Sequence, residues 1–89
     1  MGMETVLFKS QERKTRQDIA AALRRIADKV QNGELTVRQG QDSVVLSFPE
    51  SLVLEIKVEE EQGRQTKRSL EIELEWIPGE EPTGETQIL

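Results

Sequence analysis

Apolar and charged residues alternate strictly near the end of the chain, and this pattern limits the fold more than any other feature. Residues 70–76 read Leu-Glu-Ile-Glu-Leu-Glu-Trp. Successive side chains of a β-strand point to opposite faces, so the segment predicts a strand with one apolar and one acidic face. Residues 52–59 alternate in the same way. Such alternation is typical of antiparallel strands that pack on one face and meet water on the other.

Three further strands are predicted from shorter segments. Residues 4–9 are short and rich in β-formers, and residues 35–38 alternate between apolar and polar side chains. Gly40-Gln41-Asp42 supplies a turn, after which residues 44–48 alternate again. Pro49 cannot donate a backbone hydrogen bond and is expected to stop that strand.

A single helix is predicted over residues 15–32. Thr15 and Asp18 have the spacing of a capping box, with Asp in place of the usual Glu. The Asn32-Gly33 pair tolerates the left-handed conformation that ends a helix. Between these ends, apolar residues recur at helical spacing and form a narrow stripe: Ile19, Leu23, Ile26 and Val30.

Together these segments predict an α+β fold. We expect a two-layer sandwich in which one helix packs on an antiparallel sheet of four to five strands, in the order β-α-β-β-β-β. A chain of 89 residues has room for one core, so residues 1–78 are expected to form one domain. Residues 79–89 are polar, contain Pro and Gly, and are expected to form a flexible tail.

The residue types that the chain lacks exclude several kinds of function. It contains no His, Cys or Tyr, and so no thiolate, imidazole or phenol for catalysis, zinc binding or disulfide formation. We therefore expect no enzyme activity and no cofactor. The run Thr-Val-Leu-Phe of residues 5–8 is followed at once by Lys9, and no apolar stretch reaches the length of a membrane span. These features predict a soluble, cytoplasmic protein without a membrane partner.

Four segments of the chain form a distinctive set. They are the N-terminal Val-Leu-Phe-Lys-Ser of residues 6–10, Ala-Ala-Leu-Arg-Arg-Ile-Ala-Asp of residues 21–28, Gly-Glu-Leu of residues 33–35, and the closing alternation of residues 70–76. In this order they resemble the Amphi-Trp domain family. The resemblance covers residues 4–77 and is most specific in the closing strand. It implies a small prokaryotic domain of the predicted fold, without an assigned activity and without catalytic residues to carry over.

The glutamates of the closing strand are a first candidate site. Glu71, Glu73 and Glu75 share one face at intervals of about 7 Å. A calcium or magnesium site needs six or more converging oxygens, whereas a flat row of carboxylates converges on nothing. We therefore interpret the row as a solvated sheet face. Its repulsion is expected to be relieved by basic residues of the neighbouring strand, namely Lys57, Lys67 or Arg68.

Basic residues near the start of the helix are a second candidate. Residues 1–32 carry seven Lys and Arg against four Asp and Glu, whereas residues 33–89 carry five against thirteen. Arg13, Lys14 and Arg16 precede or begin the helix, a place suited to a polyanion contact. The chain has no Gly-rich phosphate loop, no aromatic residues among these cations and a net charge of −5, which favours a solvated surface.

Trp76 is the third candidate. A lone tryptophan can anchor an interface or stack on a ligand. Because Trp76 is in register with the apolar residues of the closing strand, we interpret it as a structural anchor that closes one end of the core.

These features predict a non-enzymatic protein-interaction module. It would bind an unidentified protein, or a second copy of itself through a sheet edge or its charged faces. The alternative is weak binding of nucleic acid or another polyanion through Arg13, Lys14 and Arg16.

Overall fold

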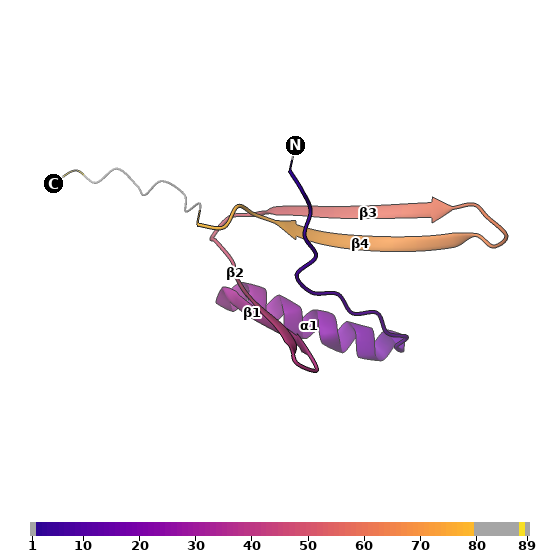
Figure 1. Cartoon of the computed structure of the whole chain (residues 1–89), viewed down its shortest axis with the longest axis horizontal. Helices are drawn as coiled ribbons and strands as arrows, with labels where there is room; N and C mark the ends of the chain where they lie inside the picture. The colour runs from indigo at the N-terminus through magenta and orange to yellow at the C-terminus, as the bar shows by residue number, and fades with distance from the viewer. Residues whose placement is uncertain (1, 80–87, 89) are drawn as a thin grey trace. The chain divides into compact units, whose positions relative to one another are not determined.

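The computed structural model describes residues 2–79 and residue 88. The chain divides into two compact units, Met1–Phe48 and Pro49–Leu89. Within the described residues there are one helix and four strands, in the order α1-β1-β2-β3-β4 (Figure 1). The strands pair as two antiparallel hairpins, β1 with β2 and β3 with β4. The α+β class is therefore confirmed.

Helix α1 spans Arg16–Asn32 and has the ends that its sequence predicts. At the N-terminus, the hydroxyl oxygen of Thr15 accepts a hydrogen bond of 3.1 Å from the backbone N–H of Asp18. At the C-terminus, Gly33 adopts the left-handed conformation with φ 92°, and its N–H donates to the carbonyls of Lys29 and Val30. Both ends of α1 are thus fixed by local chemistry.

The first hairpin joins β1, Glu34–Gln39, to β2, Asp42–Ser47. Its two-residue turn begins at Gly40 with φ 60°, which suits a type II′ turn. The ladder places Leu35 opposite Leu46 and Val37 opposite Val44, so the apolar residues of both strands share one face. Strand β1 contacts α1, and the N–H of Phe48 donates to the carbonyl of Gly33 at 2.9 Å.

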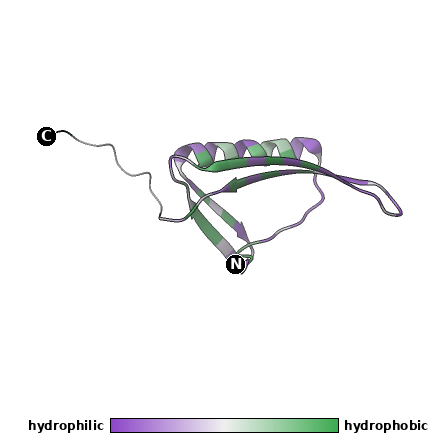
Figure 2. Ribbon diagram, turned by 90° about the horizontal axis from the view of Figure 1, so that it is seen from above, coloured by the Kyte–Doolittle hydropathy of each residue, from purple (hydrophilic) through white to green (hydrophobic). Residues whose placement is uncertain are grey.

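The second hairpin joins β3, Val53–Glu61, to β4, Lys67–Glu75. All nine residues of each strand are paired, from Val53 opposite Glu75 to Glu61 opposite Lys67. The alternation of the sequence is preserved in this register, since Leu54, Ile56 and Val58 lie opposite apolar residues of β4. Figure 2 colours the ribbon by the hydropathy of each residue.

The small amount of burial is the most unusual property of the structure. No described residue is fully buried. The nearest approach to a core is a set of partly buried apolar residues in the first unit: Val30, Leu35, Val37, Val44, Leu46 and Phe48. In α1, Ile19, Leu23 and Ile26 are 47%, 46% and 37% exposed. Each unit therefore has apolar surface that its own contacts do not cover.

The structure corrects one predicted strand. Residues 4–9 form neither helix nor strand. Their β-forming residue types are insufficient, because a strand is stabilised by cross-strand pairs and none of the four described strands pairs with this segment. The observed order therefore begins with α1 and lacks the first strand of the predicted β-α-β-β-β-β.

Two other predictions remain as predictions. The strands form two two-stranded sheets, so the single sheet covered by the helix is not confirmed. The expected flexible tail, residues 79–89, lies outside the described residues except for positions 79 and 88.

Candidate functional site

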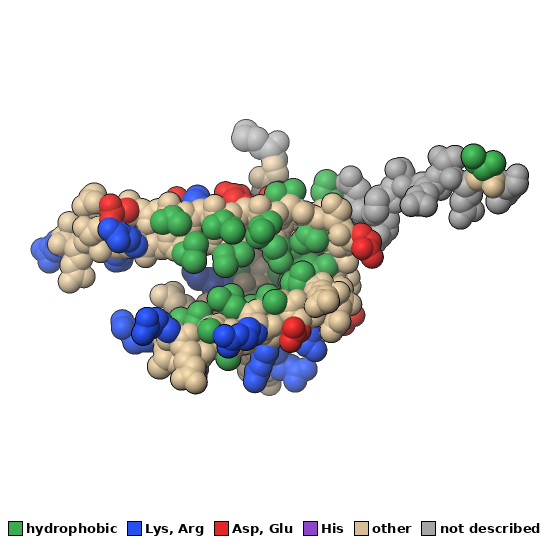
Figure 3. Space-filling view, turned by 180° about the vertical axis from the view of Figure 1, so that it is seen from behind, with side chains coloured by type: hydrophobic (Ala, Val, Ile, Leu, Met, Phe, Trp, Pro, Cys, Tyr) green, Lys and Arg blue, Asp and Glu red, His purple; other side chains and the backbone are tan. Residues whose placement is uncertain are grey.

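The β3–β4 hairpin has an exposed apolar face, formed by three cross-strand pairs. Leu54 lies opposite Leu74, Ile56 opposite Ile72, and Val58 opposite Leu70. Five of these six side chains are between 53% and 71% exposed, and Leu74 is partly buried. Figure 3 shows apolar side chains gathered in a row along the hairpin. We call these six residues the apolar face; a contiguous surface of this kind commonly marks a contact with another protein.

The opposite side of the hairpin is charged, and its charges are unevenly matched. Lys57 lies opposite Glu71 and its ammonium nitrogen is 3.5 Å from that carboxylate. Glu55 lies directly opposite Glu73, a like-charge pair. In the described part of the chain, neither of these two carboxylates has a cation within ion-pair distance. Like charges placed directly opposite one another destabilise a sheet, so Glu55 and Glu73 would gain from an added cation.

Lys57 forms two ion pairs on this side, with Glu59 and Glu71. A hydrogen bond to Glu59, at 3.2 Å, together with the charges of Glu59 and Glu71, raises the pKa of Lys57 above its ordinary value. The ammonium group is therefore charged throughout the physiological range.

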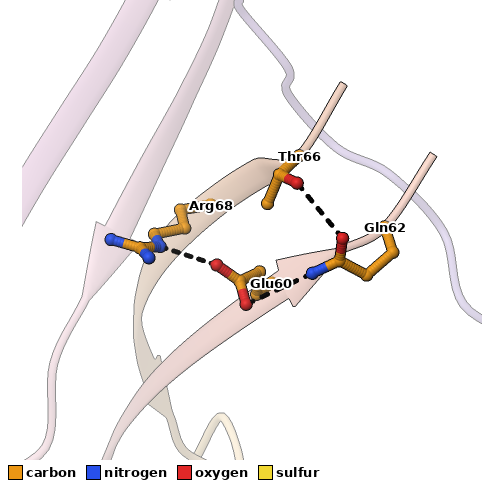
Figure 4. Close-up of polar contacts among 4 residues, drawn as sticks. All are labelled: Glu60, Gln62, Thr66 and Arg68. Carbon is orange, nitrogen blue, oxygen red and sulfur yellow. Dashed lines mark hydrogen bonds and ion pairs between the residues drawn. The ribbon is translucent and has the colours of Figure 1, made fainter. Parts of the chain in front are cut away.

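A polar network closes the far end of the hairpin (Figure 4). Arg68 donates to one carboxylate oxygen of Glu60 at 2.8 Å, and the amide nitrogen of Gln62 donates to the other at 3.4 Å. The hydroxyl of Thr66 donates to Gln62 at 3.1 Å. All four side chains are exposed, so the network orders the turn without forming an enclosed pocket.

The structure shows which basic residues relieve the glutamate row. Lys57 contacts Glu71, as predicted. Arg68 contacts Glu60, and Lys67 lies opposite Glu61, so neither meets the row at Glu71, Glu73 and Glu75. The sequence contained the residues, but only the register of the hairpin assigns them to partners. No group of three or more acidic residues that could hold a metal ion is found among the described residues.

Arg13, Lys14 and Arg16 lie together at the start of α1, and all three are exposed. Lys14 is 3.1 Å from Glu12, which satisfies part of its charge. Within the described residues, Arg13 and Arg16 form no ion pair. The region therefore presents two uncompensated guanidinium groups.

Trp76 follows β4 directly and is partly buried. It is less exposed than most residues of the apolar face. The anchor role of Trp76 stays a prediction. No described helix has the length and apolar character needed to cross a membrane.

Comparison with known proteins gives one result. The chain matches the Amphi-Trp domain over residues 1–88, which is essentially its whole length. No curated protein matches the chain. No solved structure matches it either.

Proposed function

The chain belongs to the Amphi-Trp domain family, and from that premise we propose that it is a non-enzymatic protein-interaction module that acts through its β3–β4 hairpin. The observation that carries this proposal is the apolar face, whose side chains remain largely exposed. Exposed apolar area of this kind is costly in water and is stabilised when a protein surface covers it.

Helix α1 is too small to cover the apolar side of all four strands. A helix of 17 residues has a footprint of about 250 Å². Two strands of six residues and two of nine present a sheet face of about 480 Å². The single helix α1 can therefore cover only about half of the apolar side of four strands. The other half is available to a partner.

We also propose the finer architecture that the sequence predicts. In it, α1 packs on the apolar side of one antiparallel sheet, to which both hairpins contribute. This proposal is supported by the pairing of apolar with apolar residues in both ladders, since each hairpin then has a single face suited to burial. The chain would work as one domain, in the cytoplasm.

In-cell crosslinking of the full chain tests the interaction function. We expect the 10.1 kDa chain to appear in a larger species. Ile72→Asp should abolish that species, because it places a carboxylate on the apolar face. Val45→Asp is the matched control, since Val45 is similarly exposed (58% against 53%) but lies on another strand.

Circular dichroism would establish that the Ile72→Asp variant still folds; if it does not, Ile72→Thr retains strand propensity and replaces it. A chain that crosslinks to no protein and migrates alone at its natural concentration would refute the interaction function.

The uncompensated charges of Arg13 and Arg16 favour a second candidate, weak polyanion binding that also involves Lys14. Fluorescence anisotropy with single- and double-stranded nucleic acid at low salt tests it. Replacing the three residues by Gln should then weaken binding, and the dependence on salt should become shallower. Arg24→Gln is the control. Absence of binding at low salt would eliminate this candidate.

A further inference from the structure

Strand β3 has an edge that faces away from β4, and no described strand pairs with that edge. Hairpin β3–β4 is a two-stranded sheet, and no other described strand pairs with it. Two-stranded sheets are marginally stable in water, whereas three or more strands with an apolar face are stable. Unpaired edges also expose backbone N–H and C=O groups that can template another strand. A further strand would therefore stabilise the hairpin, and the unpaired edge of β3 has the backbone groups to bind it.

The sequence of β3 has a two-fold pattern centred on Ile56. We propose that β3 pairs antiparallel with β3 of a second copy of this chain, with the symmetry axis at Ile56. Leu54 then lies opposite Val58 of the second copy, and Val53 lies opposite Glu59. Apolar residues face apolar residues on one side of the new ladder. This inference rests on the proposed function and adds a second contact of the same hairpin, the β3 edge, whose occupant is a second copy. The apolar face stays available to the partner proposed above.

Charge complementarity selects this register. With the axis at Ile56, each Glu55 lies opposite Lys57 of the second copy. Glu55 is the carboxylate that faces Glu73 within its own hairpin without a nearby cation. Moving the axis by one residue instead opposes Glu55 with Glu55 or Lys57 with Lys57, which destabilises a sheet. The paired edge thus supplies the cation that the hairpin itself lacks.

Strand β2 of the same chain is the competing occupant of this edge. Continuing the chain from β2 into β3 as a meander would place Leu46 opposite Leu54 and Val45 opposite Glu55. That pairing also matches apolar residues, but it gives Glu55 no cation. In the structure β2 pairs with β1 alone. The charge pattern therefore favours the second copy.

The resulting dimer aligns four strands in the order β4-β3-β3-β4, so the single sheet proposed above would join the first hairpin of each copy to this row at β4. About seven residues of each β3 take part, which adds about six to eight backbone hydrogen bonds. The two apolar faces become one continuous surface. The dimer is isologous and closed, because the pairing uses the same edge of each copy.

Cysteine crosslinking tests the geometry directly, since the chain contains no Cys. In Ile56→Cys the two thiols lie directly opposite, with Cα atoms about 5 Å apart, so mild oxidation should produce a disulfide-linked dimer. Ile72→Cys is the matched control, because Ile72 is the partner of Ile56 within the hairpin. Its two copies would be separated by three strand spacings, about 14 Å, and should not crosslink.

Charge reversal tests the register in solution. Glu55→Lys removes the repulsion within the hairpin but opposes the introduced ammonium group with Lys57 of the second copy. It should raise the dimer dissociation constant by about tenfold to a hundredfold. Lys57→Glu should have a similar effect. An equal mixture of the two variants should form a heterodimer, and the double variant should dimerise again. Sedimentation velocity at low ionic strength measures each constant.

Glu73→Lys is the control for the charge experiment. It makes the same change in net charge and relieves the same pair within the hairpin, but Glu73 lies on β4, away from the proposed edge. It should dimerise as the wild type does.

The outcomes separate this inference from the proposed function. Dimerisation that Glu55→Lys leaves unchanged, or equal crosslinking of the two cysteine variants, overturns pairing through β3 while an interaction function survives. A wild-type chain that is monomeric at all accessible concentrations also overturns the pairing. If that chain still forms a complex with another protein in cells, the module stands without self-association. If it forms none, both proposals fail.

Discussion

Replacing Gly33 by Ala tests how far a single backbone angle stabilises the first unit. Gly33 has φ 92°, and a Cβ built at this position meets no heavy atom within 4 Å. The cost of the substitution is therefore conformational and contains no steric clash. An L-residue in the left-handed region costs about 1–2 kcal/mol, from which a few tenths are recovered because Ala restricts the unfolded chain.

We expect Gly33→Ala to lower the free energy of unfolding by about 1 kcal/mol, equivalent to a fall in Tm of about 4–8 °C for a domain of this size. Urea unfolding followed by far-ultraviolet circular dichroism measures the change, provided that the slope with denaturant stays constant. Gly33→Asn should cost less, because Asn adopts the left-handed region more readily than other non-glycine residues.

Gly63→Ala is the control and should have the opposite sign. Gly63 does not have a positive φ, and its added Cβ would meet only the carbonyl oxygen of Gln65 at 3.7 Å, an ordinary contact. Reduced freedom of the unfolded chain should then leave stability equal or higher by about 0.4–1 kcal/mol. The reasoning fails if Gly33→Ala is as stable as wild type, or if Ala and Asn at position 33 are equally costly.

Three further predictions concern local interactions. Thr15→Ala removes the N-cap of α1 and should lower stability by about 1 kcal/mol, whereas Thr15→Ser should retain it; thermal unfolding compares the two. The raised pKa of Lys57 means that its stabilising contribution is complete below the ordinary lysine pKa, about 10.4, and is lost as the pH rises through the higher folded-state pKa. Urea unfolding at a series of alkaline pH values should show this loss in wild type and not in Lys57→Gln. A double-mutant cycle on Glu60 and Arg68 should give a coupling below about 1 kcal/mol, because both side chains are exposed; a larger value would contradict a surface ion pair.

The elements that the sequence predicts well are those governed by neighbouring residues. The ends of α1 depend on Thr15 and Gly33, whose chemistry acts within one turn of the chain. The alternation of β3 and β4 fixes which residues share a face, because the side-chain period of a strand is two.

The elements that the sequence predicts poorly depend on distant partners. Residues 4–9 have the composition of a strand, but a strand requires a neighbouring edge, and none of the four described strands supplies it. The like-charge pair of Glu55 and Glu73 also could not be identified before the register was known. Its position follows from the five-residue connection between β3 and β4, whose length the sequence pattern leaves open.

The backbone of Gly33 joins the helix and the first hairpin into one cooperative element. Its N–H donates to the carbonyls of Lys29 and Val30 at the end of α1, and its carbonyl accepts a hydrogen bond from the N–H of Phe48, which follows β2. Unwinding the end of α1 would therefore weaken the hydrogen bond between Phe48 and Gly33. Separating β1 from β2 would likewise weaken the hydrogen bonds from Gly33 to the end of the helix. We expect the amide of Phe48 to exchange with solvent deuterium at the same rate as the amides of the last turn of α1, as in a single unit of local unfolding.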